Sequence, residues 1–307
     1  MRPAAALIAM CFALAIAGCG GSTSGDSKGG QTGTPAAPPG SLEALWRAQG
    51  EDVAIVAGTS DYGPGPNRVS FLIVDRRSRL VATKTAKVWV ARGLRQAPFL
   101  ETTAASESIG VPGGDRADAA EIYVTHVDLP APGRYWILAE PVGGKQIQAL
   151  GNVVVKKEPA TPGLGDHAIP SETPTLADVG GDPSKITTAT PPDTELLRTS
   201  VAQAIAAREP FVVAFATPKF CQSRTCGPVV QVVQAVARKL EGSGVRFIHV
   251  EVYEDNDPAK GTNRWVDEWH LPTEPFTFVV DRHGIIRAKL EGAFSVGELE
   301  AAVEKVT

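Results

Sequence analysis

Apolar and polar residues alternate along residues 53–157, where Val, Ile, Tyr and Trp are frequent. A period of two is typical of strands that bury one face, and β-branched and aromatic residues favour the same structure. Turn signals rich in Gly and Pro separate these stretches, at residues 63–66, 111–114, 130–133 and 143–144. The predicted strands are residues 53–56, 68–75, 80–91, 121–129, 134–140 and 146–156. We therefore expect an all-β domain at residues 45–157.

A different pattern begins at residue 193, where helix-like and strand-like stretches alternate. The expected helices span residues 199–207, 227–240, 262–269 and 295–306, and the expected strands span residues 211–216, 245–253, 276–280 and 285–290. Such alternation indicates a βαβ arrangement around a central sheet, at residues 193–307. Residues 158–192 are rich in Pro and Gly, and form a linker or an irregular segment that packs on the second domain.

The first residues resemble an export signal. Residues 4–17 form an apolar run that is too short to span a bilayer and is typical of a signal peptide, here residues 1–18. The run ends in Ile16-Ala17-Gly18-Cys19, which resembles the lipobox of bacterial lipoproteins and implies a lipid on Cys19. Secretion with ordinary cleavage after a small residue is the alternative. Residues 19–44 are rich in Gly, Ser, Thr and Pro, so we expect a flexible tether.

Composition narrows the classes of function. The chain has 307 residues, 43% hydrophobic and 21% charged, which excludes a wholly disordered or coiled-coil protein and suggests two domains. The net charge is −4 and basic residues do not cluster, so we expect no nucleic-acid partner. The four cysteines are too few for a disulfide-dense secreted scaffold.

Two cysteines, Cys221 and Cys226, lie between an expected strand and an expected helix. The N-terminus of a helix stabilises a thiolate through its dipole and unpaired amides, and Lys219 and Arg224 would lower a thiol pKa further. Since Cys226 opens the helix, we expect it to have the lower pKa of the two. An oxidising extracytoplasmic compartment favours a disulfide between this pair, the only thiols left once Cys19 carries a lipid and the signal is removed.

A second motif follows at residues 271–284, where Pro275 precedes an apolar strand that ends in Asp281 and a Gly turn. With the cysteine motif and the order of elements, it makes residues 193–307 resemble the thioredoxin superfamily, especially its membrane-anchored thioredoxin-like and redoxin proteins. In that family the proline is usually cis and faces the cysteines. The chain departs from the family pattern in its C-x4-C spacing, in Val229 at the family's second cysteine, and in Ala214 at the position of a buried acid.

The resemblances imply a fold class of two domains. Residues 129–136, LPAPGRYW, look like the turn and strand entry of immunoglobulin-like domains, which implies an all-β immunoglobulin-like sandwich at residues 45–157. The C-terminal resemblance implies an α/β thioredoxin-like fold at residues 193–307. In such a protein the sandwich would be a spacer or a docking module.

The implied function is thiol–disulfide exchange with exported proteins, by a lipoprotein held on the extracytoplasmic face of the cell membrane through Cys19. The implied catalytic residues are Cys226, Cys221 and Pro275, and no cofactor is implied. Aligning the chain from Cys226 through the helix makes Cys226 the nucleophile. The alternative alignment makes Cys221 the nucleophile and Cys226 the resolving residue. The partners would be thiols or disulfides of exported proteins.

Two other functions fit the same residues. One is a binding protein with a static Cys221–Cys226 disulfide, which recognises its partner through the groove at Pro275 or through the sandwich. The other resembles the Sco-type copper proteins, in which two cysteines and a later histidine bind the metal, a soft ligand set that suits copper. His270 is the candidate histidine here, but the cysteine spacing is wider than in that family and His270 lies too far before Asp281.

Overall fold

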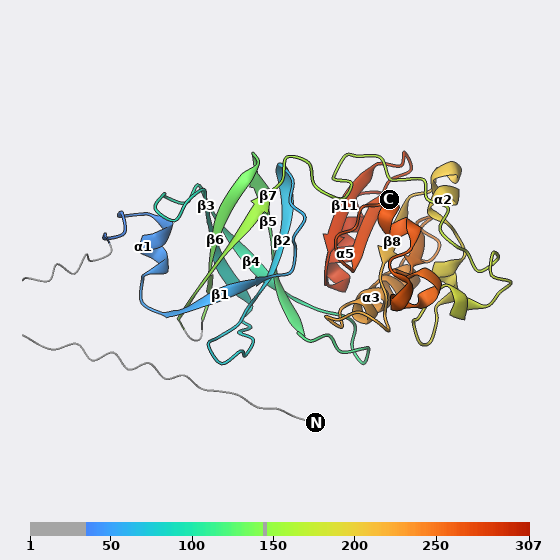
Figure 1. Cartoon of the computed structure of the whole chain (residues 1–307), viewed down its shortest axis with the longest axis horizontal. Coiled ribbons are helices and arrows are strands. Elements are labelled where there is room, and N and C mark those ends of the chain that lie inside the picture. The colour runs from blue at the N-terminus through green and yellow to red at the C-terminus, as the bar shows by residue number, and fades with distance from the viewer. Residues whose placement is uncertain (1–34, 144–145) are drawn as a thin grey trace, which may run out of the picture. The chain divides into compact units, whose positions relative to one another are not determined.

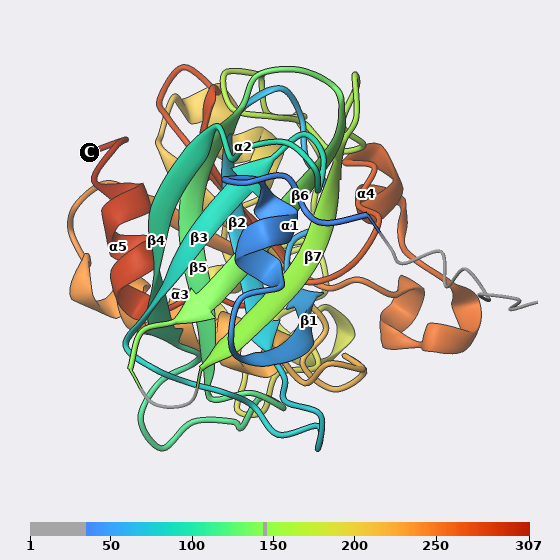
Figure 2. The same ribbon diagram turned by 90° about the vertical axis from the view of Figure 1, so that its left-hand side faces the viewer.

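The computed structural model describes residues 35–143 and 146–307 (Figures 1 and 2). The expected signal peptide, the lipidation residue Cys19 and most of the expected tether lie outside the described residues. Residues 37–307 form one compact unit. Within the part of the chain that is described, no helix is long and apolar enough to cross a membrane.

Seven strands close into a barrel, drawn in blue and green in Figure 1. They are β1 (Glu51–Ala57), β2 (Gly65–Ile73), β3 (Thr85–Ala91), β4 (Leu100–Ser108), β5 (Glu121–Leu129), β6 (Gly133–Pro141) and β7 (Ile147–Val155). Their order around the barrel is β1-β2-β5-β4-β3-β6-β7. The barrel closes because β1 pairs with β2 on one side and, in parallel, with β7 on the other.

Alternate residues of these strands fill the inside of the barrel. Its interior is a packed core that includes four large aromatic side chains, Tyr62, Phe71, Tyr123 and Tyr135. On the outside, the short helix α1 (Leu42–Trp46) buries Leu42 against Trp89 and Leu138. The interior of a seven-stranded barrel is narrow enough for side chains to fill.

The expected immunoglobulin-like sandwich is therefore wrong. A sandwich has two sheets with free edges, whereas β1 and β7 pair with each other and remove the edges. The alternation of apolar and polar residues does not distinguish a sandwich from a closed barrel, because both architectures bury one face of every strand. Strand β4 was also missed, because Leu100 is its only large apolar residue and the rest of its sequence is Glu, Thr, Ala and Ser.

The second sheet lies in the C-terminal part of the chain. Its strands are β8 (Phe211–Phe215), β9 (Arg246–Val250), β10 (Phe276–Val280) and β11 (Ile286–Glu291), in the order β11-β10-β8-β9. Strands β8 and β9 are parallel, and the other pairs are antiparallel. The helices are α2 (Val201–Ala207), α3 (Cys226–Lys239), α4 (Arg264–Glu268) and α5 (Val296–Val303). Short 3-10 helices are η1 (Pro183–Lys185), η2 (Thr194–Leu197), η3 (Glu254–Asn256) and η4 (Pro258–Lys260).

An apolar core covers each face of this sheet. The core on one face contains Val229 and Val233 of α3 and Leu299 of α5. The core on the other face contains Val201 of α2 and the fully buried Trp269. Strands β8 and β10 are buried along their whole length, which explains why their sequences are apolar apart from Thr277.

The expected thioredoxin-like α/β fold is wrong as well. The described residues are mostly β, with a closed seven-stranded barrel, a four-stranded mixed sheet and five short α-helices. The helix expected at residues 262–269 shortens to the five residues of α4. The local motifs were correctly placed between strand and helix, but motifs of this length do not determine the architecture around them.

Buried polar contacts join the barrel to the second sheet. Glu291 at the end of β11 accepts hydrogen bonds from the backbone N–H groups of Ser60 and Asp61, at 2.9 and 3.0 Å. Arg68 of β2 donates to the backbone oxygens of Glu291 and Ala293, at 3.0 and 2.7 Å. Because these groups are buried and satisfied by each other, they fix the loop that follows β1 against the end of β11.

Candidate thiol site

The candidate site is the loop between β8 and α3. After β8 the chain turns at Thr217, whose carbonyl oxygen accepts a hydrogen bond from the N–H of Cys221 at 3.1 Å. The turn continues through Arg224, which has a left-handed φ of 54°. Helix α3 then begins at Cys226, and Pro228 is tolerated in its first turn because the amide of that position has no helical partner.

Gly227 lets the barrel approach the start of α3. A Cβ atom at this position would meet the carboxylate oxygen Oδ2 of Asp115 at 2.7 Å, so this exposed carboxylate would have to turn away. The backbone N–H of Asp115 donates a 2.8 Å hydrogen bond to the side chain of Gln231 on α3. The β4–β5 connection therefore packs closely against the start of α3 at Gly227.

The structure brings the two predicted cysteines together as thiols. Both are free of disulfides, and their sulfur atoms share a hydrogen bond. Cys226 is fully buried, whereas 9% of Cys221 remains exposed. The sulfur of Cys221 also lies 3.4 Å from the hydroxyl oxygen of Ser223 and 3.9 Å from that of Thr225. Both cysteines are buried, and Cys221 is the more accessible member of the pair.

Hydrogen bonds lower the pKa of Cys221 to about 5. The largest contribution is the hydrogen bond from the thiol of Cys226, which outweighs the opposing effect of burial. The hydroxyl of Ser223 and the backbone N–H groups of Cys226 and Thr225 lower the pKa further. The unpaired amides at the start of α3 therefore stabilise a thiolate on Cys221, which lies in the loop before the helix.

The pKa of Cys226 is raised, first by burial and then by the hydrogen bond and negative charge of Cys221. The expectation that Cys226 has the lower pKa is therefore wrong. Its sulfur is enclosed, so the position at the helix start does not compensate for the loss of water. The two basic neighbours have other contacts, because Lys219 lies over the ring of Phe220 and Arg224 pairs with Asp118 at 3.7 Å.

The segment before β10 supplies the third predicted residue. Pro275 is buried, and its peptide bond with Glu274 is cis. Burial raises the pKa of the Glu274 carboxyl, and negative charge on Cys221 raises it further. Strand β10 pairs with β8 in such a register that Phe276 faces Phe215, so Pro275 and the cysteine loop emerge at the same end of the sheet.

A buried polar network forms hydrogen bonds with the first residues of the loop between β8 and α3. The hydroxyl of Thr188 accepts from the N–H of Lys219 at 3.2 Å and donates to the Glu251 carboxylate. His249 bridges the carbonyl oxygen of Ala216, at 2.9 Å, and the hydroxyl of Thr187, at 3.3 Å. Sequence reasoning missed the two threonines, because nothing in the Pro- and Gly-rich segment signals that they reach β9.

The histidine considered for copper does not join the thiols. His270 is exposed, and in the described residues no group of three His, Cys, Asp or Glu side chains is arranged to hold a metal ion. His249 has both ring nitrogens engaged by Ala216 and Thr187. The chemistry that this arrangement offers is that of a low-pKa thiolate beside a second thiol.

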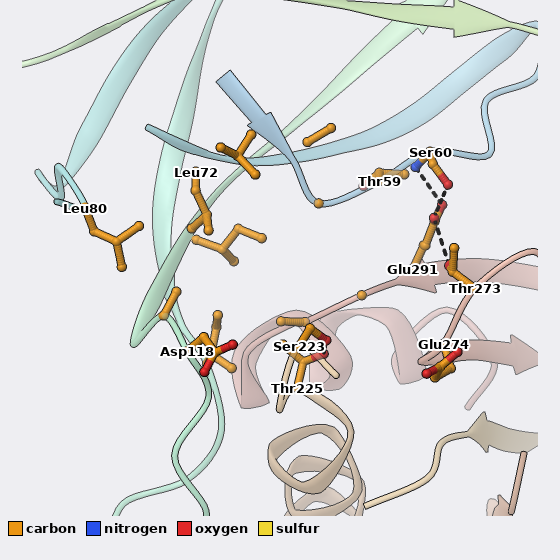
Figure 3. Close-up of a pocket in the computed structure, with 18 residues that line it drawn as sticks. Thr59, Ser60, Leu72, Leu80, Asp118, Ser223, Thr225, Thr273, Glu274 and Glu291 are labelled. Atoms are coloured by element: carbon orange, nitrogen blue, oxygen red, sulfur yellow. Dashed lines mark hydrogen bonds between the residues drawn. The ribbon is translucent and has the colours of Figure 1, made fainter. Parts of the chain in front are cut away.

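A pocket of about 510 Å³ opens next to the loop between the two cysteines, of which Ser223 and Thr225 line it (Figure 3). One wall is formed by Glu274 and by Ser223 and Thr225, whose hydroxyl groups contact the sulfur of Cys221. The opposite wall comes from the barrel and is mostly apolar. Its large side chains are those of Val56, Leu72, Leu80, Ile109 and Ile122. None of these barrel residues was expected to take part in a site.

The sequence matches no protein-family model, and no curated protein matches it. The function is therefore inferred from the geometry and chemistry of the thiol site itself.

Proposed function

We propose that this protein is a lipid-anchored, extracytoplasmic thiol–disulfide exchange protein that acts on exported proteins. The observation that carries the proposal is the unequal thiol pair. Cys221 is the more accessible thiol and has a pKa of about 5, and Cys226 is fully buried, protonated and hydrogen-bonded to it. Thiolates are the attacking species in exchange, so one member of the pair is prepared to attack and the other to resolve.

The exchange reaction balances within this pair and one partner. The Cys221 thiolate attacks a sulfur of the partner disulfide, and the partner's other sulfur leaves as a thiolate, which forms a mixed disulfide. Cys226 then loses its proton to that leaving group or to solvent, and its sulfur attacks the Cys221 sulfur. The bond between Cys221 and the partner breaks, and the partner leaves as a dithiol that has gained two electrons, while Cys221 and Cys226, which have lost two electrons, are joined in a disulfide. The reverse sequence oxidises a partner dithiol.

A low pKa also helps the mixed disulfide to react when a partner dithiol is oxidised. Cys221 is a good leaving group when the partner's second thiol attacks the mixed disulfide, since its thiolate is stabilised by the hydrogen bonds of Ser223 and the α3 amides. A purely structural bond between these residues would close a ring of only a few residues, and would stabilise the fold by roughly 2 kcal/mol in the loop-entropy model. Hydrogen bonds that stabilise a thiolate on Cys221 would serve no purpose in a permanent structural disulfide.

The proposed location rests on the start of the chain. The Ile16-Ala17-Gly18-Cys19 sequence supports lipidation after export, and the thiol chemistry suits the oxidising compartment to which such a signal leads. The proposed partners are therefore exported proteins with cysteines, and the membrane that holds the lipid on Cys19.

A redox titration tests the proposed function. The full-length protein is equilibrated in thiol–disulfide buffers, its remaining thiols are alkylated, and the products are counted by mass spectrometry, with Cys221→Ser as the unreactive control. Exchange predicts a reduction potential between about −120 and −270 mV. A potential below roughly −300 mV would identify a static bond and contradict the proposal.

A further inference from the structure

We propose that the pocket beside Cys221 binds the segment of the partner polypeptide that flanks its reactive cysteine, and that it selects an apolar side chain next to a basic one. This inference rests on the proposed exchange function, and it names the class of substrate that the site accepts. It is carried by the position of the pocket, by its apolar barrel wall and by the charge of its lining.

The position of the pocket fits a substrate that reacts with Cys221. Ser223 and Thr225 line it, and their hydroxyl oxygens lie 3.4 and 3.9 Å from the Cys221 sulfur. Glu274, at the neighbouring edge, is close enough for the charge of Cys221 to raise its pKa. A partner cysteine that reaches the sulfur therefore brings its neighbours along the chain toward Ser223 and Thr225 and into the pocket that they line (both labelled in Figure 3).

The barrel wall offers apolar surface that the folded chain leaves uncovered. Val56 and Leu80 are 47% and 44% exposed, although most large hydrophobic side chains of the described residues are buried. Both line this pocket, with Leu72, Ile109 and Ile122 around them. Covering such a surface with an apolar side chain contributes about 25 cal/mol for each Å² removed from water.

The lining carries negative charge. Asp118, Glu274 and Glu291 belong to it, and no Lys, Arg or His does. Glu291 is occupied by Ser60 and Asp61, and Asp118 pairs with Arg224, so Glu274 is the carboxylate that remains for a partner. A basic side chain beside the partner cysteine complements it, whereas an acidic peptide or an anionic small thiol is repelled.

A volume of about 510 Å³ fits a few side chains and lies within the range of small-molecule sites. A polypeptide segment is favoured because the two features that the pocket recognises lie on opposite walls, and because Ser223 and Thr225, which contact the reactive sulfur, belong to its lining. A chain that runs past Cys221 can place a basic residue at Glu274 and an apolar residue at Val56 and Leu80 together.

Peptide binding tests this without requiring the exchange reaction. The full-length protein in lipid nanodiscs is titrated with a fluorescent peptide that contains Leu, Lys and a Ser in place of the reactive Cys. Two further peptides carry Lys→Glu or Leu→Ser. The first peptide should bind about tenfold more tightly than either of the others, which corresponds to about 1.4 kcal/mol.

Matched variants locate the binding. Val56→Thr with Leu80→Ser removes apolar surface from the pocket and should abolish the tenfold preference for Leu. Val154→Thr with Leu164→Ser is the control, since these residues are 50% and 51% exposed but lie outside the pocket. Equal binding of all three peptides, or an equal effect of both double variants, would overturn the inference. Peptide displacement by an alkyl chain with no effect of Lys→Glu would identify an acyl-chain site and would also overturn it.

Reaction with a small neutral disulfide, hydroxyethyl disulfide, separates the two proposals. If Cys221 reacts with this reagent but the peptides bind without preference, the exchange function stands and the pocket inference fails. If the peptides bind with the expected preference and Cys221 reacts with no disulfide, the pocket inference is supported and the exchange function fails.

Discussion

The sulfur of Cys221 lies 3.4 Å from the hydroxyl oxygen of Ser223, which in turn lies 2.7 Å from the hydroxyl oxygen of Thr225. Two of the four residues between the cysteines therefore place hydroxyl groups around the sulfur that attacks. The segment that separates the cysteines is long enough to fold back on the first of them. The C-x4-C spacing thus provides hydrogen bonds to the thiolate as well as a second thiol.

Ser223→Ala should raise the pKa of Cys221, because the thiolate loses a hydrogen bond and the thiol loses less. The expected increase is roughly one pH unit, since hydrogen bonds to charged groups contribute about 1.5 kcal/mol or more. The pH dependence of Cys221 alkylation measures it, and the midpoint should move upward from about 5. Ser223→Thr, which keeps a hydroxyl, is the control and should restore the midpoint. An unchanged midpoint in the alanine variant would mean that the Ser223 hydroxyl does not stabilise the thiolate.

The lowered pKa of Cys221 predicts a pH-dependent contribution to stability of the reduced protein. A thiol with a folded-state pKa of about 5 and an unfolded value near 9.0 binds fewer protons in the folded state between these limits. Folding is then favoured increasingly as pH rises from about 5 to about 9, and this contribution is lost as pH falls back through 5. Denaturant unfolding of reduced wild type and of Cys221→Ser should show a stability difference that grows over this range. A constant difference would show that Cys221 has an ordinary pKa.

Asp61 should be essential for holding the barrel against the second sheet. Its side chain is fully buried and accepts from the N–H groups of Ala160 and Thr161, and Lys289 lies 3.2 Å away. Burial raises the pKa of this carboxyl, but these hydrogen bonds and the lysine charge together lower it well below its usual range. Asp61→Asn leaves the lysine without its charge partner, and should destabilise the fold by about 3 to 5 kcal/mol.

Chemical denaturation measures the effect of Asp61→Asn. The control is Asp128→Asn, also in the N-terminal half but exposed, which should change stability by less than about 0.5 kcal/mol. Equal stability of the two variants would contradict the role given to Asp61.

Lipidation of Cys19 is a prediction of the sequence alone. Cys19→Ala should block acylation, so that precursor accumulates or protein is released into the medium. Cys11→Ala is the matched control, because that residue lies within the expected signal peptide and is removed with it. Metabolic labelling with a fatty acid measures the acylation directly. Normal labelling and membrane retention of Cys19→Ala would rule out the lipoprotein assignment.

The sequence predicted most of the elements, but not how they assemble. Strands were correctly expected at residues 121–129, 134–140 and 276–280, because their alternating or largely apolar sequences reflect local burial. Closure of the barrel depends on pairing between β1 and β7, about a hundred residues apart, which leaves no local pattern. The resemblances to an immunoglobulin-like sandwich and a thioredoxin-like domain rested on short motifs. They led to the wrong folds because such motifs do not determine how the strands and helices assemble.

The candidate site, too, could be predicted from the sequence only in part. Two cysteines at a strand-to-helix junction could be found from the sequence, and so could Pro275, which the structure places at the same end of the sheet. The order of the two thiol pKa values could not be predicted from the sequence, because it depends on the complete burial of Cys226. The apolar wall of the pocket, with Val56 and Leu80, comes from barrel strands and loops that fold back to the cysteines over more than a hundred residues.

The most direct test of the account is to trap the mixed disulfide with single-cysteine variants. Full-length Cys226→Ser and Cys221→Ser proteins are each incubated with a model partner disulfide, and covalent adducts are counted on non-reducing gels and by mass spectrometry. Since Cys221 is the more accessible thiolate and Cys226 the resolving thiol, Cys226→Ser should accumulate the adduct and Cys221→Ser should form little. Adducts that accumulate on Cys221→Ser instead, or on neither variant, would contradict the assignment of Cys221 as the attacking thiol of an exchange pair.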